Sequence, residues 1–192
     1  MAWLKNGSPL CLASASPRRL ELLQQVGIKP FVSPAEIDET IKPGETPRHY
    51  VKRMATTKAR STMNQDHARV LAADTIVVLD GVVLGKPFDN QEAEQMLERL
   101  SGRPHQVMTA IALFQPQREK IDALVVETAV WFKKVSRAEI QAYVATGEPM
   151  DKAGSYGIQG FGAFMVERID GSYTAVVGLP LFETLSLLTN SN

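Results

Sequence analysis

The sequence predicts an α/β protein with a mixed β-sheet and flanking helices. Strand-like and helix-like segments alternate along the whole chain of 192 residues, which favours an α/β fold over an all-helical or all-strand one. Several strand pairs are joined by short turns, such as Asp80-Gly81 and Asp170-Gly171, and hairpins of this kind make neighbouring strands antiparallel. No linker rich in Gly, Ser or Pro divides the chain, so residues 1–192 are expected to form a single domain.

The first strand and the first helix are expected near the N-terminal end. Residues 10–13 form a short apolar run typical of a buried strand. Ser16 suits the N-cap of a helix, Pro17 suits its first position, and Gly27 ends it. The sequence therefore predicts a strand-to-helix junction just before Pro17.

The rest of the chain continues the alternation. Thr46-Pro47 repeats the signal of a helix start, Asp80-Gly81 is a two-residue hairpin turn, and Ser101-Gly102 closes an amphipathic helix. Further strands are expected at residues 31–33, 70–79, 82–84, 106–114, 123–132, 163–169 and 173–177, and further helices at residues 46–65, 90–100, 136–145 and from 180 onward.

The composition excludes several classes of function. Lys and Arg together number 21, and so do Asp and Glu, whereas a protein that coats nucleic acid needs a basic surplus. The single cysteine, Cys11, excludes an intramolecular disulfide and a zinc site built from cysteines. No apolar run approaches the roughly 20 residues that span a bilayer. We therefore expect a cytoplasmic protein with neither a nucleic-acid nor a membrane partner.

Two arginines stand at the start of the first predicted helix, in the segment 14–19 (SASPRR). The first turn of a helix carries positive partial charge and unpaired N–H groups, so acidic residues suit it better. Arg18 and Arg19 conflict with that charge unless an anion lies beside them. A phosphate would resolve the conflict by accepting backbone, hydroxyl and guanidinium hydrogen bonds together. We interpret the segment as a phosphate-binding site; the alternative is that both arginines are simply solvated.

An aspartate stands inside an otherwise apolar strand, in the segment 72–78 (AADTIVV). Asp is disfavoured in strands, and a buried carboxylate costs several kcal/mol unless it is paired or bound to a metal. Asp74 is therefore a candidate ion-pair partner, metal ligand or general base, and a carboxylate that only faces the surface or forms an ion pair is the alternative. Thr75 points to the opposite face of a regular strand, and it lines a cleft if the chain bends there.

Two further segments carry candidate binding residues. Gly85-Lys86-Pro87 resembles the end of a P-loop, but the upstream glycine and the final hydroxyl are missing, so that interpretation fails. Lys86 is then either a phosphate-binding ammonium or a solvated lysine. Residues 154–162 hold several glycines, which allow close backbone approach. Within them Gln159 offers an amide that can pair with an imide such as uracil, and an exposed glutamine is the alternative.

Two charged residues have equally open interpretations. Glu39, in the acidic loop 36–45, is a candidate magnesium ligand or a solvated side chain. Lys58 lies on a helix that carries many charges, and it is either a substrate contact or a surface lysine. No nucleophile elbow and no pairing of Cys with His supports covalent catalysis.

Taken together, these segments resemble the Maf family of nucleoside triphosphate pyrophosphatases. Each block is short, but the blocks occur in the family's order and cover nearly the whole chain. The only mild departure is Ala15, where a related sequence carries glycine. The blocks are 12–19 (LASASPRR), 73–77 (ADTIV), 85–87 (GKP), 100–102 (LSG), 151–154 (DKAG) and 177–180 (VGLP).

The resemblance implies a fold and an activity. The fold is an elongated α/β structure with a strongly bent mixed sheet and a cleft between two lobes, akin to inosine triphosphate pyrophosphatases. The activity is hydrolysis of a nucleoside triphosphate between the α and β phosphates. Asp74-Thr75 and the segment 156–160 (YGIQG) look like the branch that acts on dTTP and UTP, whereas the branch acting on methylated GTP differs in both places. Arg18, Thr75 and Gln159 match the positions that the family uses for substrate choice.

A mechanism follows as a hypothesis. Asp74 is the general base for attack of water on the α-phosphorus, and Asp74 with Glu39 holds a divalent Mg²⁺ or Mn²⁺ ion. Gln159 and Thr75 read the pyrimidine ring. The triphosphate is held by Ser14, Ser16, Arg18, Arg19, Lys58 and Lys86.

Two rival functions remain at this point. A non-catalytic, nucleotide-sensing regulator linked to cell division would bind the same triphosphate without turnover. A nucleic-acid-binding protein would use Arg18-Arg19 and Lys133-Lys134, although the neutral net charge argues against it. A homodimer is plausible under any of these interpretations.

Overall fold

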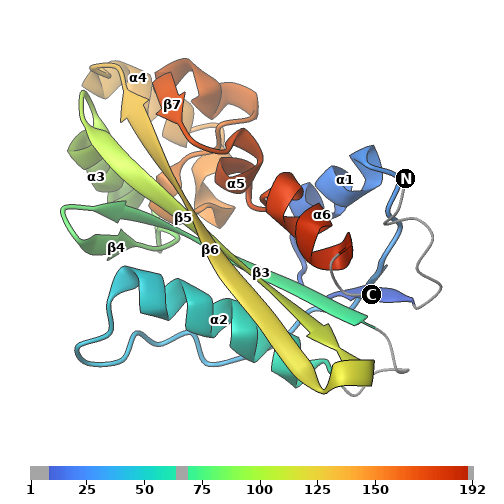
Figure 1. The fold of residues 1–192 in the computed structure, drawn as a ribbon. Helices are drawn as coiled ribbons and strands as arrows, with labels where there is room; N and C mark the ends of the chain where they lie inside the picture. Colours follow the sequence, from blue (N-terminus) through green and yellow to red (C-terminus); the bar gives the residue numbers. More distant parts are fainter. Residues whose placement is uncertain (1–8, 64–68, 190–192) are drawn as a thin grey trace. The chain divides into compact units, whose positions relative to one another are not determined.

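A computed structural model describes residues 9–63 and 69–189 and contains a mixed seven-stranded sheet with helices around it (Figure 1). The predicted mixed α/β class is confirmed. The strand order is β2-β1-β3-β5-β6-β7, and β4 pairs with β3. The strands are β1 (Leu10–Leu12), β2 (Phe31–Val32), β3 (Arg69–Leu79), β4 (Val82–Leu84), β5 (Pro104–Gln115), β6 (Lys120–Phe132) and β7 (Val166–Asp170).

The pairing of the strands shows why the sheet is mixed. β1 runs parallel to β2 and β3, whereas β3 with β4 and β6 with β7 are antiparallel. The turn between β3 and β4 has positive φ at Asp80 (52°) and at Gly81 (78°), as a tight hairpin turn requires. The hairpin expected there is confirmed, with Val78 opposite Val83.

The helices largely follow the expected positions. Pro17 and Pro47 each stand at the first position of a helix, and Ser136 and Glu139 form a capping box. The α-helices are α1 (Pro17–Gln25), α2 (Pro47–Ser61), α3 (Asn90–Leu100), α4 (Arg137–Val144), α5 (Tyr173–Val177) and α6 (Leu181–Thr189). Short 3₁₀ helices are η2 (Pro116–Arg118), η3 (Glu148–Asp151), η4 (Ala153–Ser155) and η5 (Gly160–Met165).

Two expected strands differ in the structure. The segment 173–177 is the helix α5, because Ser172 acts as its cap: the Ser172 hydroxyl accepts a hydrogen bond from the Ala175 N–H at 3.2 Å. The strand expected at 163–169 begins only at Val166, since η5 occupies the residues before it.

The described residues form two compact units. The first comprises residues 9–63, 69–74, 109–126 and 178–189, and the second comprises residues 75–108 and 127–177. The division passes through β3, so that Asp74 belongs to the first unit and Thr75 to the second.

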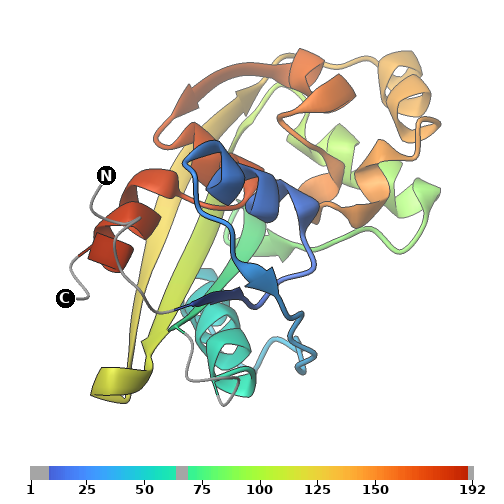
Figure 2. The same cartoon turned by 90° about the vertical axis from the view of Figure 1, so that its right-hand side faces the viewer.

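The first unit contains β1, β2 and the N-terminal half of β3. α2 covers one side of these strands, while α1 and α6 lie on the other side (Figures 1 and 2). β1 and β3 are almost fully buried, whereas β2 is exposed, and α2 presents an apolar face with Val51, Met54 and Ala55 inaccessible to solvent. A buried strand thus carries Asp74 beneath a packed helix.

The second unit has its own apolar core, to which α3, α4 and the C-terminal half of β3 contribute. An edge-to-face aromatic cluster of His105, Phe132 and Tyr156 lies in the same unit. The core residues are Val77, Leu79, Leu84, Ala93, Met96, Leu97, Leu100, Val107, Val130, Phe132, Val135, Ile140, Tyr143, Val144, Tyr156 and Met165.

Within residues 9–63 and 69–189, no helix is long and apolar enough to cross a bilayer.

Candidate active site

The start of α1 is built around a buried hydroxyl. Ser14 follows the buried strand β1, and its Oγ accepts hydrogen bonds from the Ser16 N–H at 3.2 Å and from Arg19 Nη1 at 2.9 Å. Arg19 Nε donates to the Gly178 carbonyl at 2.9 Å. The structure thus brings Ser14, Ser16 and Arg19 together, and it fixes the Arg19 guanidinium at the helix entrance.

Arg19 is electrostatically coupled to acidic residues. Desolvation lowers the pKa of its guanidinium, Asp74 and Glu39 act in the opposite direction, and the neighbouring Arg18 lowers it further. The two arginines therefore repel each other at the helix start, and the two carboxylates of the same unit partly offset that repulsion. This helix entrance is a cationic surface suited to an anion that carries several charges.

A lysine joins the two candidate acids. Lys58 Nζ, on α2, lies 2.6 Å from Asp74 Oδ1 and 2.7 Å from Glu39 Oε1. Asp74 is 9% exposed on β3, whereas the Glu39 side chain is largely exposed. The ion-pair interpretation of Asp74 is therefore confirmed in its geometry, and Glu39 and Lys58 are part of the same cluster.

The protonation of Asp74 is set by opposing effects. Desolvation raises the pKa of this carboxyl above its ordinary value, and the negative charge of Glu39 acts in the same direction. The charge and hydrogen bond of Lys58, together with Arg19, lower the pKa and offset part of that rise. A carboxylate with a raised pKa is a stronger proton acceptor, which suits a general base.

The loop that carries Glu39 is anchored to α2 by Tyr50 and by Arg53. The Tyr50 hydroxyl donates to the Glu39 carbonyl at 2.9 Å. Arg53 forms two hydrogen bonds to the Glu45 carboxylate at 2.7 and 2.6 Å and one to the Thr40 carbonyl at 2.9 Å. Tyr50 could have been found from the sequence, because it lies on the apolar face of its helix and a buried tyrosine hydroxyl needs a hydrogen-bond partner.

Both anchoring contacts involve groups whose pKa is shifted away from the neutral range. The hydrogen bonds from Arg53 lower the pKa of Glu45 to about 2. Burial, followed by the charges of Asp74 and Glu39, raises the pKa of Tyr50 to about 12. Both groups therefore keep their hydrogen-bonding states across the neutral range, and the loop stays attached to α2.

The two carboxylates fit a divalent cation of the kind that the family resemblance implies. In the described part of the chain, no three His, Cys, Asp or Glu side chains gather to hold a metal by themselves. Asp74 and Glu39 nevertheless converge on one cationic atom, the Lys58 ammonium. Magnesium is commonly bound by one or two carboxylates together with substrate phosphates. The residues thus fit an ion that a bound phosphate would help to hold.

The second unit holds the other candidate residues. Thr75 is half-buried and lines a small pocket of about 30 Å³ with Val77, Val107, Ala153, Tyr156, Ile158 and Val176. Gln159 is half-buried and follows the pocket residue Ile158. Thr75 and Gln159 therefore belong to the same unit, and Ile158, next to Gln159 in the chain, lines the pocket with Thr75.

Lys86 lies in an exposed turn of the second unit. The Gly154 N–H donates to the Gly85 carbonyl at 2.9 Å, so the 85–87 and 151–154 segments meet. Arg18, in the first unit, is half-buried beside Arg19. The predicted residues thus fall into a first-unit group and a second-unit group: Ser14, Ser16, Arg18, Arg19, Glu39, Lys58 and Asp74 in the first, and Thr75, Lys86 and Gln159 in the second.

Fold and site together define an α/β protein in which a buried carboxylate and a cationic helix entrance share one unit, an arrangement suited to phosphate chemistry. The chain belongs to the Maf-like protein family, whose model matches residues 9–191. The family suggested by the sequence blocks is confirmed.

The curated relatives match almost end to end. A protein of Symbiobacterium thermophilum is 54% identical over 94% of this chain and 92% of its own length. A protein of Aliivibrio fischeri is 52% identical over 92% of this chain and 95% of its own. Both are named dTTP/UTP pyrophosphatase. Among solved structures, the Staphylococcus aureus Ham1 protein is a distant likeness, with a TM-score of 0.49 and 15% identity over 82% of this chain and 79% of its own.

Proposed function

We propose that this chain hydrolyses dTTP and UTP to the nucleoside monophosphate and pyrophosphate. The names of relatives that are 54% and 52% identical over nearly the full length support this assignment. The observation that carries it is the buried Asp74 carboxylate, which Lys58 holds at 2.6 Å in the unit that also contains the Arg18-Arg19 helix entrance. A proton acceptor and a polyphosphate-binding surface are the two parts that the reaction needs.

In the proposed mechanism, Asp74 accepts a proton from the attacking water. The water oxygen forms a bond to the α-phosphorus, and the bond from the α-phosphorus to the bridging oxygen breaks. The electron pair of that bond leaves with pyrophosphate. Lys58 binds Oδ1 of Asp74, so we assign Oδ2 as the oxygen that takes the proton.

Positive groups stabilise the charge that moves onto the leaving pyrophosphate. Ser14 and Arg19 are already held in place by mutual hydrogen bonding, which favours binding because little side-chain freedom is lost. The residues proposed to contact the triphosphate are Ser14, Ser16, Arg18, Arg19, Lys58 and Lys86.

A divalent Mg²⁺ or Mn²⁺ ion, held by Asp74 and Glu39, would supply neutralisation of phosphate charge. Lys58 lies 2.6 Å from Asp74 and 2.7 Å from Glu39. Its ammonium therefore neutralises part of the charge of these two carboxylates before substrate binds. Chelation is expected to abolish turnover, and added Mg²⁺ or Mn²⁺ is expected to restore it.

Selection of the nucleobase is assigned to Thr75, Gln159 and Arg18. An amide at a fixed orientation can pair with the imide of thymine or uracil, and a purine would leave that amide unpaired. Loss of such a pairing rejects a wrong substrate more effectively than a small difference in size does.

The domain organisation, location and partners of the enzyme are part of the same proposal. Residues 1–192 act as one catalytic domain in the cytoplasm, where nucleoside triphosphates are abundant, as a monomer or a homodimer without nucleic-acid or membrane partners. The single family match over residues 9–191 and the formal net charge of zero support this assignment.

A coupled assay for pyrophosphate tests the proposal. Purified protein with Mg²⁺ is given dTTP, UTP, CTP and GTP in turn, and the values of kcat/KM are compared. We expect pyrophosphate from dTTP and UTP and much less from CTP and GTP. Binding of dTTP without pyrophosphate release would instead favour the nucleotide-sensing regulator. Equal turnover of all four would retain the reaction and overturn the pyrimidine assignment.

A further inference from the structure

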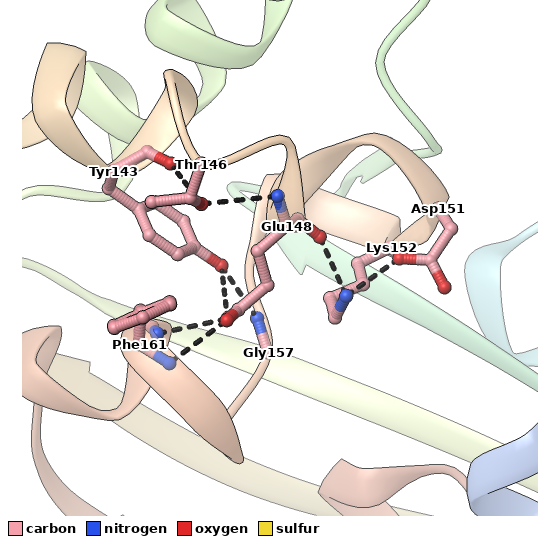
Figure 3. A network of polar contacts seen from close by, with 8 residues as sticks. Tyr143, Thr146, Glu148, Asp151, Lys152, Gly157 and Phe161 are labelled. Atoms are coloured by element: carbon pink, nitrogen blue, oxygen red, sulfur yellow. Dashed lines mark hydrogen bonds and ion pairs between the residues drawn. The ribbon is translucent and has the colours of Figure 1, made fainter.

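One carboxylate outside the Asp74 cluster gathers hydrogen bonds from a glycine-rich surface segment (Figure 3). Glu148 Oε2 accepts from the Phe161 N–H at 2.9 Å, and Oε1 accepts from the Gly162 N–H at 3.0 Å. The Tyr143 hydroxyl donates to the same Oε1 at 2.9 Å. Glu148 therefore fixes the far end of residues 157–162.

Tyr143 fixes the near end of the same segment. Its hydroxyl accepts a hydrogen bond from the Gly157 N–H at 3.2 Å while it donates to Glu148. Its ring belongs to the buried core of the second unit. Together, Glu148 and Tyr143 attach both ends of residues 157–162 to the core. We call this pair the Glu148–Tyr143 clamp.

The Glu148 side chain makes these hydrogen bonds as a carboxylate. Partial burial raises its pKa, but the N–H groups of Gly162 and Phe161 and the hydroxyl of Tyr143 outweigh this effect, and the pKa lies below the ordinary value. Hydrogen bonds to an ionised acceptor are stronger than those between neutral groups. The clamp is therefore firm at neutral pH.

The segment fits the clamp sterically. A Cβ added at Gly162 would lie 2.7 Å from the Tyr143 hydroxyl oxygen, so only glycine permits the close approach. The side chain of Phe161, whose N–H is held by Glu148, is 69% exposed. Burial of the Phe161 side chain therefore does not hold this part of the segment, and the clamp does.

The clamped segment carries Gln159, to which nucleobase selection is assigned, and the neighbouring residue Ile158. Ile158 lines the pocket that Thr75 also lines, and Gln159 is the next residue. A glutamine amide that can rotate suits thymine and cytosine equally, because reversing it exchanges donor and acceptor. The place of that amide depends on where the backbone of Gln159 lies, so a segment that is held still favours one pairing over the other.

We infer that Glu148 and Tyr143 are positioning residues that hold Ile158 and Gln159 in the orientation that selects thymine and uracil over cytosine. This inference rests on the proposed function. The clamp acts through Gln159 and the pocket wall, and it leaves the Asp74 cluster of the other unit unchanged.

The test compares two variants with two matched controls. Tyr143→Phe removes one hydroxyl, and Glu148→Gln replaces an acceptor with an amide N–H₂ group. Tyr173→Phe and Glu167→Gln make the same changes at exposed positions of the same unit. For each protein, kcat and KM are measured with dTTP and with dCTP, and folding is checked by circular dichroism and urea unfolding.

We expect each clamp variant to raise KM for dTTP about tenfold, the effect of losing a hydrogen bond to a charged group. A change of less than about twofold is expected in kcat, because ground-state binding of the nucleobase is affected rather than the chemical step. The preference for dTTP over dCTP is expected to fall by about the same tenfold. Tyr173→Phe and Glu167→Gln should have the same kcat, KM and preference for dTTP over dCTP as the unmodified chain.

Two outcomes would overturn the inference. One is an unchanged preference in folded Tyr143→Phe. The other is an equal loss of kcat for both nucleotides, which a merely structural role would cause. If Glu148→Gln does not fold, Tyr143→Phe alone decides between these results, since it removes a single oxygen atom.

A fifth variant separates this inference from the proposed function. Gln159→Ala should lose the same preference, and Tyr143→Phe added to it should change the preference no further, because the clamp acts through Gln159. An unchanged preference in Gln159→Ala would contradict the proposed role of Gln159 itself. A loss in Gln159→Ala with none in Tyr143→Phe would contradict the clamp only. Absence of pyrophosphate release by the unmodified chain would contradict both.

Discussion

The ammonium of Lys58 lies 2.6 Å from Oδ1 of Asp74 and links helix α2 to strand β3. The same nitrogen lies 2.7 Å from Glu39, so one positive charge faces two negative ones. Asp74 is buried while Glu39 is largely exposed, and solvent therefore screens the second contact more than the first. Any change to Lys58 or Glu39 should therefore alter the protonation of Asp74.

Lys58→Met is expected to destabilise the fold by about 3 kcal/mol at neutral pH, because it leaves the Asp74 carboxylate buried without its partner. Without Lys58, the pKa of Asp74 rises further above its unfolded value, since the charge and hydrogen bond of Lys58 both lower it. The folded variant then binds a proton that the unfolded chain releases, so its stability falls as pH rises above the unfolded Asp pKa of about 3.9. Urea unfolding at several pH values measures this.

Lys120→Met is the matched control, because Lys120 forms an ion pair with Asp122 but its side chain is 65% exposed. Its stability loss should be much smaller and should not depend on pH in this way. An equal loss in the two variants, or a deficit in Lys58→Met that is the same at pH 5 and pH 8, would contradict the buried ion pair.

The pH dependence of turnover should report Asp74. Because the pKa of Asp74 is raised, the acid limb of kcat/KM is expected to have its midpoint above the ordinary Asp value of about 3.9. Glu39→Gln removes a negative charge that raises this pKa, so the midpoint should move to lower pH. The titration of the nucleotide itself is common to both proteins, and an unmoved midpoint would argue against Asp74 as the titrating group.

Arg19→Lys is expected to weaken substrate binding although it keeps the charge. Nε and Nη1 of Arg19 reach Gly178 and Ser14 at once, and an ammonium cannot reproduce this forked geometry. We expect KM for dTTP to rise about tenfold and the stability to fall by about 1 kcal/mol. Arg60→Lys, at an exposed position of α2 in the same unit, should change neither quantity. A wild-type KM in Arg19→Lys would show that only charge matters at the helix entrance.

Gly154→Ala should destabilise the second unit more than an alanine at another glycine with positive φ. A Cβ at Gly154 would lie 2.8 Å from Val77, whereas one at Gly147, with a φ of +75°, would meet nothing within 4 Å. Both alanines suffer the left-handed backbone strain, of about 1 kcal/mol, but only Gly154→Ala also displaces core atoms. Equal urea midpoints for the two variants would contradict the tight contact between Gly154 and Val77.

Local signals in the sequence were enough to predict much of the fold. Pro17 and Pro47 marked helix starts, and Asp80-Gly81 marked a hairpin, because each acts through its own backbone conformation. The segment 173–177 misled the prediction, since its β-branched residues favour strands while the cap that makes it a helix comes from one hydroxyl, that of Ser172.

The candidate site was predicted less completely, for a physical reason. The isolated carboxylate in an apolar strand drew attention to Asp74 because burying a charge is costly. Its partner Lys58 is 16 residues away, and nothing in the local pattern distinguishes it from other helical lysines. Lys58 was named as a substrate contact, but its ion pair with Asp74 was not predicted. Glu148 was not singled out, because its bonds to Phe161 and Gly162 cross 13 and 14 residues of chain.

The measurement that tests the central claim most directly is the turnover of dTTP by Asp74→Asn with Mg²⁺, followed by pyrophosphate release. The amide keeps the shape of Asp74 but cannot accept the proton from water. The account expects kcat to fall by about 10² to 10⁴, the usual cost of losing a general base, with dTTP still bound and the fold intact. A folded variant whose kcat falls less than about tenfold would contradict the assignment of Asp74 as the base.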